Sequence, residues 1–91
     1  MLDLVLSNRF RKDMKLARKR GYDMNLLEDV VSKLQRQESL PEKNRDHALS
    51  GDYAGFRECH IQPDWLLVYR IDEGELLLFL SRTGTHSDLF S

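Results

Sequence analysis

Apolar residues recur along this chain with two different periods, and the change of period separates a helical half from a sheet half. Residues 2–6 largely alternate between apolar and polar side chains, which predicts a short strand. Residues 8–20 and 24–37 place apolar side chains three and four positions apart, which predicts two amphipathic helices. Ser7 or Asn8 can cap the first of these helices, and Asp23 is a suitable N-cap for the second. Because the link between them is short, we expect an antiparallel helical hairpin.

The second half alternates with a period of two from Tyr53 onward. Polar residues over 38–52 predict a loop before it, and a loop of that length is often functional. Strands are predicted over 53–61, 65–71 and 75–80. The sequence therefore predicts an α+β fold in one domain, residues 1–91. It has a short N-terminal strand, a two-helix hairpin, an antiparallel sheet of three further strands and a short tail after Gly84.

Composition narrows the class of protein further. Of the 91 residues, 41% are hydrophobic and 32% are charged, which is typical of one globular domain. The single cysteine, Cys59, excludes an internal disulfide and a cysteine-based zinc site, and it favours a reducing cytoplasmic location. The first residues lack the pattern of a signal peptide, and no apolar run is long enough for a membrane helix.

The charge is unevenly distributed, although the net charge is only −1. Seven of the 14 lysines and arginines fall between Arg9 and Arg20, where Asp13 is the one acidic residue. A solvated helix face usually mixes both signs, so we interpret this face as a docking surface for a polyanion. The residues expected to bind it are Arg11, Lys12, Lys15, Arg18 and Lys19.

Candidate chemistry lies at the ends of the predicted strands. The histidines are His47, His60 and His86, and each lies in a loop or at a strand end. Taken singly, each fits a surface histidine. Pairing of the last two strands as a hairpin would bring His60 and His86 to one edge of the sheet, together with Asp64 and Arg82. Imidazoles beside a carboxylate and a guanidinium suit proton transfer around a phosphate. The spacing of the histidines matches no zinc motif, so neither a metal nor a cofactor is expected.

Three ordered stretches of the sequence resemble the YafQ toxins, a family of the RelE/ParE superfamily of bacterial toxin–antitoxin systems. They are residues 45–51 (RDHALSG), residues 55–69 (GFRECHIQPDWLLVY) and residues 82–90 (RTGTHSDLF). The resemblance covers nearly the whole chain. It implies two N-terminal helices against an antiparallel sheet, in a RelE-like fold. It also implies an endoribonuclease that depends on the 70S ribosome, cuts mRNA in the ribosomal A site and so inhibits translation. The implied partner is an antitoxin of the DinJ type, in a hetero-oligomer, with the free toxin a monomer.

The resemblance also implies roles for single residues. The catalytic set that it implies is His47, His60, Asp64 and His86. The substrate-binding set that it implies is Arg82, Phe90 and Glu58. This chain departs from some members at Ala48, where they have proline, and at Glu58, where a close relative has aspartate.

A metal-free mechanism is the expected chemistry, because RNA carries its own nucleophile in the 2′-hydroxyl group. In this hypothesis His86 is the general acid, and His60 or His47 is the base. Asp64 orients the base, and Arg82 holds the phosphate charge. Two alternatives stay open from the sequence: a non-catalytic ParE-like toxin that acts on DNA gyrase, and an inactive toxin that serves as a co-repressor with its antitoxin.

Overall fold

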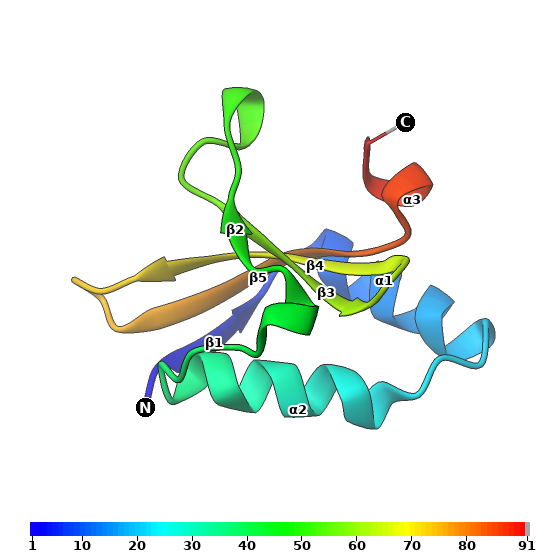
Figure 1. Ribbon diagram of the computed structural model, residues 1–91, viewed down its shortest axis with the longest axis horizontal. Helices are drawn as coiled ribbons and strands as arrows, with labels where there is room; N and C mark the ends of the chain where they lie inside the picture. The colour runs from blue at the N-terminus through cyan, green and yellow to red at the C-terminus, as the bar shows by residue number, and fades with distance from the viewer. Residues whose placement is uncertain (91) are drawn as a thin grey trace.

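Five strands form one mixed sheet with the strand order β1-β5-β4-β3-β2, as the ribbon of this computed structural model shows (Figure 1). The structure describes residues 1–90. In chain order the elements are β1 (Asp3–Leu6), α1 (Asn8–Lys19), α2 (Met24–Gln35), the 3-10 helix η1 (Glu42–Asn44), β2 (His47–Ala48), the 3-10 helix η2 (Gly51–Tyr53), β3 (Arg57–Gln62), β4 (Trp65–Asp72), β5 (Leu77–Gly84) and α3 (His86–Phe90). The α+β prediction is confirmed. Over residues 1–90, no helix has the length and apolarity needed to span a bilayer.

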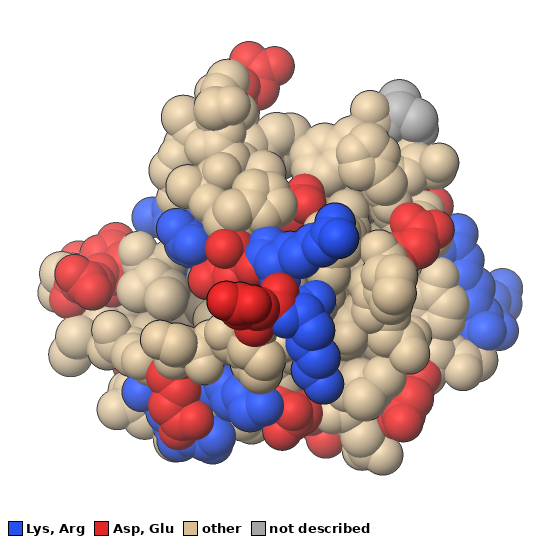
Figure 2. All heavy atoms as spheres, viewed as in Figure 1, with Lys and Arg blue, Asp and Glu red and all other residues tan. Residues whose placement is uncertain are grey.

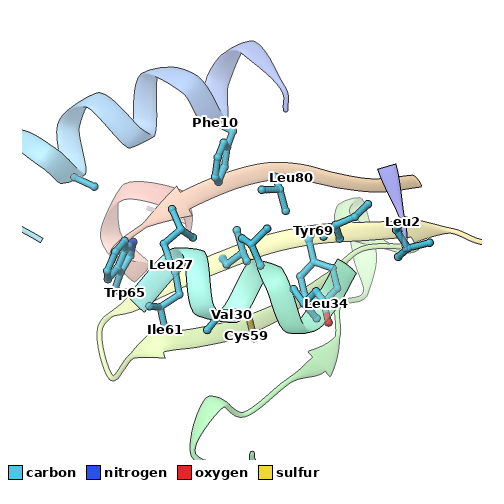
Figure 3. Close-up of a cluster of buried hydrophobic side chains, with 14 residues drawn as sticks. Leu2, Phe10, Leu27, Val30, Leu34, Cys59, Ile61, Trp65, Tyr69 and Leu80 are labelled. Carbon is cyan, nitrogen blue, oxygen red and sulfur yellow. The ribbon is translucent and has the colours of Figure 1, made fainter. Parts of the chain in front are cut away.

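The two N-terminal helices begin at the predicted caps. The Ser7 hydroxyl accepts the Phe10 N–H, and the Asp23 carboxylate accepts the Asn25 N–H. The helices run in opposite directions across one face of the sheet (Figure 3). Helix α1 packs against β5 and α2 against β3, and an apolar groove of about 370 Å³ lies between the two helices. The predicted hairpin is therefore splayed, because each helix packs mainly against the sheet.

The three later strands form the predicted antiparallel sheet, β3 with β4 and β4 with β5, and the short N-terminal strand joins this sheet in the other direction. β1 pairs with β5 in parallel, with Asp3 opposite Leu77 and Leu6 opposite Leu80, whereas the other strand pairs are antiparallel. A parallel pair needs a long crossover connection, and the whole segment from α1 to β4 provides it. The strand order is not readable from the sequence, because alternation defines strands and not their neighbours.

The main core lies between the two helices and the sheet (Figure 3). The apolar side chains that the helical periods predicted for α2 are all buried there: Leu27, Val30, Val31 and Leu34. They face Cys59 of β3 and Tyr69 of β4. A smaller cluster on the opposite face contains Leu66, Val68 and Leu89. Because both faces of β4 are covered, its side chains from Trp65 to Tyr69 are buried without alternation.

The segment 38–52 is not the plain loop that its composition predicted. It contains η1, β2 and η2, and buried contacts attach it to the sheet. Asn44 is 5% exposed and donates a hydrogen bond of 2.7 Å to the His60 carbonyl. Asp46 accepts hydrogen bonds from Tyr69 and Arg57. These contacts join residues 11 to 23 positions apart, which explains why local composition did not reveal them.

The C-terminal segment also differs from the prediction. β5 was expected to end near residue 80, but it continues to Gly84, and the short tail predicted after Gly84 is helix α3, which begins at His86. Leu89 is 8% exposed and anchors α3 to the smaller core. The helix has five residues, which is too short to be stable alone, so its position depends on such tertiary contacts.

We predict that Cys59 is unreactive in the folded protein. Its side chain is fully buried, and burial raises the pKa of its thiol to about 12. At pH 8 the nucleophilic thiolate is therefore nearly absent. Modification by a disulfide reagent should be at least ~10²-fold slower in buffer than in denaturant. Equal rates in the two solvents would contradict the burial of this strand.

Candidate functional site

Two rows of side chains cross the sheet on the face opposite α2. The strand register places opposite residues on the same side of a sheet. The first row, across β2, β3, β4 and β5, contains His47, Glu58, Val68 and Arg82. The second row contains His60, Leu66 and Gly84. In Figure 1 this face lies above the sheet, between the segment that carries β2 and η2 on one side and α3 on the other. The candidate site is thus built on strands, with loops only at its rim.

A β-bulge in β5 determines which face Arg82 occupies. Val68 lies opposite Arg82, but its neighbour Tyr69 lies opposite Leu80, so Ser81 is an extra residue on β5. Leu80 points into the helix-side core. Strict alternation would have sent Arg82 to the same side, and the extra residue places it on the side of Val68.

Glu58 lies between two imidazoles. Its Oε1 atom is 3.7 Å from Nε2 of His47 and 3.7 Å from Nε2 of His60. The Glu58 side chain is 9% exposed, whereas the His47 side chain is 50% exposed and the His60 side chain is 20% exposed. A nearly buried carboxylate favours a positive charge close by. This geometry suits an imidazole that must take up a proton.

The hydrogen bonds of the two imidazoles define which ring nitrogen is available. Nδ1 of His47 is 2.7 Å from the Arg45 carbonyl, and Nδ1 of His60 is 3.1 Å from the Pro63 carbonyl. A carbonyl only accepts, so each Nδ1 carries a proton. In a neutral ring, Nε2 then holds the free electron pair. Both Nε2 atoms face Glu58, so each is placed to act as a base.

Asp64 does not contact an imidazole in the described structure, and the hypothesis that it orients the base is not supported by a contact. Its Oδ1 atom accepts the backbone N–H of His86 at 3.3 Å. Asp64 therefore links the turn after His60 to the start of α3. The carboxylate that faces the imidazoles is Glu58, which the resemblance implied for substrate binding.

Arg82 is paired with Asp13 of α1. Nε of Arg82 donates to Oδ2 at 2.7 Å, and a second guanidinium nitrogen donates to Oδ1 at 3.2 Å. The same carboxylate accepts the Thr83 N–H at 3.1 Å. Asp13 thereby raises the pKa of Arg82, which stays charged. The remaining guanidinium N–H groups are the ones that a phosphate would use.

Aromatic rings line the α3 side of this face. The rings of Phe90 and His86 have centroids 5.2 Å apart, and Phe90 also meets Tyr53 edge-on at 5.5 Å. Phe90 is half-buried in the smaller core, so both interpretations of its ring, core contact and base stacking, fit its position. Tyr53 was not in the predicted set. Nothing in its local sequence singled it out, because η2 brings it to Phe90 from 37 residues away.

The basic residues predicted on α1 all face solvent: Arg11, Lys12, Lys15, Arg18 and Lys19. Asp13, the one acid among them, points toward β5, so it does not neutralise this face. A shallow hollow of about 390 Å³ lies along it and is lined in part by Arg11, Lys15 and Arg18. Figure 2 shows basic side chains at the right-hand edge of the molecule, over the end of α1. The charge separation on α1 supports the docking-surface interpretation.

Histidines and carboxylates are also common metal ligands. Across residues 1–90, no group of three or more His, Cys, Asp and Glu side chains is arranged to hold a metal ion. The reactive groups that this face itself offers are the imidazoles, Glu58 and Arg82.

This fold and this face define a small α+β protein with an imidazole-rich site on its sheet and a basic helix beside it. The family model described as a bacterial toxin of type II toxin–antitoxin systems, YafQ, matches residues 2–91. The chain belongs to the YafQ toxin family.

Three relatives illustrate the similarity. The mRNA interferase toxin YafQ of Escherichia coli strain K12 is 42% identical over 89 residues, which is 97% of this chain and 95% of the relative. A metal-bound toxin from Helicobacter pylori has 48% identity and a TM-score of 0.94, over 99% of this chain and 100% of that one. The toxin in the E. coli DinJ-YafQ toxin-antitoxin complex has 41% identity and a TM-score of 0.89, over 99% of this chain and 98% of that one.

We predict that Asp46 holds His47 in place through β2. Burial and the Asp46 hydrogen bond raise the pKa of the Tyr69 phenol, which remains a donor to that carboxylate. Replacing Asp46 by Asn removes the negative charge that accepts hydrogen bonds from Tyr69 and Arg57. We expect this change to destabilise the segment around β2 by about 1–3 kcal/mol. Amide hydrogen exchange should increase at residues 45–49 and stay unchanged in α2. Asp52→Asn, a change of the same kind at an exposed residue of η2, is the control. Equal exchange in the two variants would contradict this role.

Proposed function

We propose that this protein is the toxin of a type II toxin–antitoxin system and a ribosome-dependent endoribonuclease that cleaves mRNA in the A site. The observation that carries the proposal is the arrangement of His47, His60 and Glu58 on the sheet face that also presents Arg82. The name of the E. coli relative, an mRNA interferase toxin, supports the same activity. The basic face of α1 gives the protein a surface for ribosomal RNA.

The proposed reaction needs no metal. Nε2 of His60 or His47 takes the proton of the 2′-hydroxyl group, whose oxygen attacks the adjacent phosphate. Glu58 stabilises the imidazolium that forms, since it lies 3.7 Å from both rings. Arg82 stabilises the charge on the phosphorane oxygens with its free N–H groups. His86 gives a proton to the leaving 5′-oxygen. The products are a 2′,3′-cyclic phosphate and a 5′-hydroxyl end.

We further propose that an antitoxin of the DinJ type binds this toxin. The solved complex of the E. coli relative contains DinJ and YafQ together, and that toxin shares 41% of its sequence with this chain. The toxin and its antitoxin would form a hetero-oligomer in the cytoplasm. An acidic antitoxin segment would complement the basic face of α1, which lacks an exposed acid.

The general-acid role of His86 is tested with His86→Ala. Loss of a general acid typically lowers the rate ~10²–10⁴-fold, so cleavage of ribosome-bound mRNA should fall by that factor. Ribosome binding should be retained, because His86 lies outside the basic face. Arg36→Ala is the control, since Arg36 lies at the end of α2 and forms its ion pair with Glu38, away from the sheet face of the imidazoles. Full cleavage by His86→Ala would show that another group donates the proton.

Two further observations separate this proposal from its rivals. Cleavage should persist in EDTA at a concentration that leaves the ribosomes intact, and its loss there would contradict the metal-free scheme. Induction of the toxin should arrest growth with new mRNA 5′ ends. Arrest with intact mRNA and a DNA-damage response would instead indicate action on gyrase. No arrest in the absence of antitoxin would indicate an inactive co-repressor.

The docking role of α1 is tested by charge reversal. Changing Lys12, Lys15 and Arg18 to Glu should weaken ribosome binding and reduce the slope of log affinity against log salt by ~0.7–0.9 for each phosphate that the variant no longer binds. Folding should be unchanged, because these side chains are exposed. The control reverses two basic residues at the C-terminal end of α2, Lys33 and Arg36, and is compared with an α1 variant in which only Lys12 and Lys15 are reversed. Equally weakened binding in these two double variants would show that only the net charge matters, and unchanged affinity in the α1 variants would exclude this docking face.

A further inference from the structure

We propose that Arg20 and Asp88 form a clamp that positions the imidazole of His86 for proton donation. The inference rests on the proposed function, because the position of His86 matters only if this side chain takes part in the reaction. Neither Arg20 nor Asp88 belongs to the predicted catalytic, substrate-binding or ribosome-binding sets. The two residues lie 68 positions apart and meet at the start of α3.

The clamp is bidentate. One guanidinium nitrogen of Arg20 donates to Oδ2 of Asp88 at 2.6 Å, and the other donates to Oδ1 at 3.2 Å. Isolated surface ion pairs contribute little, but a two-pronged pair fixes an orientation as well as a distance. Arg20 also interacts with Tyr22. The Tyr22 ring packs against the ring of the buried Trp65, with the two ring centroids 4.8 Å apart. The guanidinium is therefore held on the body of the protein.

Asp88 completes a second set of contacts within α3. Its Oδ2 atom accepts the Thr85 N–H at 2.9 Å, and the Thr85 hydroxyl accepts the Asp88 N–H at 3.1 Å. This reciprocal pair is a capping box, with aspartate in the place of the usual glutamate. The residue that follows Thr85, at the first helical position inside this box, is His86. The carboxylate that caps α3 is thus the carboxylate that Arg20 holds.

Gly84 permits this close arrangement. Its φ of +155° is rarely adopted by other residues, and a Cβ atom at this position would lie 2.9 Å from Oδ2 of Asp88. The backbone at residue 84 therefore lies so close to the Asp88 carboxylate that a residue with a Cβ atom would push against it.

The other anchors of α3 lie toward the sheet and η2, and one of them is the edge contact of Phe90 with Tyr53. Leu89 buries one side of the helix, and Asp64 accepts the His86 N–H at the long distance of 3.3 Å. A five-residue helix has little stability of its own. The Arg20 clamp adds a short contact on the side of α3 that faces α1, so the helix is held from two directions.

The clamp persists over the pH range in which histidines titrate. Arg20, and next the Thr85 N–H, hold the pKa of Asp88 well below its usual range. A carboxylate with a lowered pKa contributes its stabilisation above the ordinary pKa of aspartate and loses it only as the pH falls through the lowered value. The clamp is therefore present throughout the neutral pH range in which cleavage is measured.

The test compares Arg20→Ala with Lys19→Ala, which removes the same charge from the same helix end without touching Asp88. Arg20→Ala should lower kcat on ribosome-bound mRNA by ~10–10²-fold, the loss expected for a misplaced catalytic group, and leave KM for ribosomes nearly unchanged. Lys19→Ala should raise KM, and Arg36→Ala, which breaks an exposed arginine–carboxylate pair at the end of α2, should change neither kcat nor KM. A rise in KM alone for Arg20→Ala would make Arg20 a ribosome contact and overturn the clamp.

Two double variants show whether Arg20 acts through Asp88 and through His86. Arg20→Ala with Asp88→Asn should lose no more activity than the larger single effect, since the two residues share one interaction. Arg20→Ala in the His86→Ala background should add no further loss. Additive losses in either pair would overturn the proposal. Arg20→Lys, which keeps one of the two donors, should recover part of the kcat that Arg20→Ala loses.

A readout independent of cleavage separates failure of this inference from failure of the proposed function. Amide exchange of residues 85–90 should increase in Arg20→Ala and stay at the wild-type level in Lys19→Ala. Unchanged exchange in Arg20→Ala would overturn the clamp even if the protein cleaves mRNA. Increased exchange with unchanged kcat would overturn its positioning role. An inactive wild-type protein would instead refute the proposed function.

Discussion

One extra residue in β5, Ser81, governs how the two faces of the sheet are used. Before it, Leu80 belongs to the helix-side core, and after it Arg82 belongs to the face of the imidazoles. β1 pairs only with residues 77–80, so the rest of β5 leaves the edge of the sheet open beyond that point. At this open edge the Asp13 carboxylate accepts a hydrogen bond from the Thr83 N–H and two hydrogen bonds from the Arg82 guanidinium. The same carboxylate therefore closes the sheet edge and orients a site residue.

The elements that could be predicted are those whose signal is local. Helices α1 and α2 follow from caps and apolar spacing, and the strands from alternation or continuous apolar runs. The parallel placing of β1 could not be predicted, because it depends on contacts between residues about 74 positions apart. The ordered segment 38–52 was missed for the same reason, since Asn44 and Asp46 find their partners on distant strands. Helix α3 was missed because its anchors lie in α1, η2 and the turn at Asp64.

The candidate site shows the same division between residue identity and residue role. Sequence motifs pointed to His47, His60, His86 and Glu58, and the register places three of these within one pair of neighbouring rows. The motifs assigned the orienting carboxylate to Asp64, which follows His60 across the proline turn. The carboxylate that lies nearest to the imidazoles is that of Glu58, because alternation on β3 directs Glu58 and His60 to the same side. Roles that depend on direction need the register, and the register is a property of the assembled sheet.

The parallel pairing of β1 with β5 also affects the order in which the chain can fold during its own synthesis. A strand made among the first residues has no partner until residues 77–80 have been made, and closing a loop of that length has a large entropic cost. The main core shares Leu2 with Leu78 and Leu80, so it too waits for the last strand. Arg82 and His86 follow immediately. The nascent chain therefore completes its core and gains Arg82 and His86 within the same few residues, and it carries no assembled site before then.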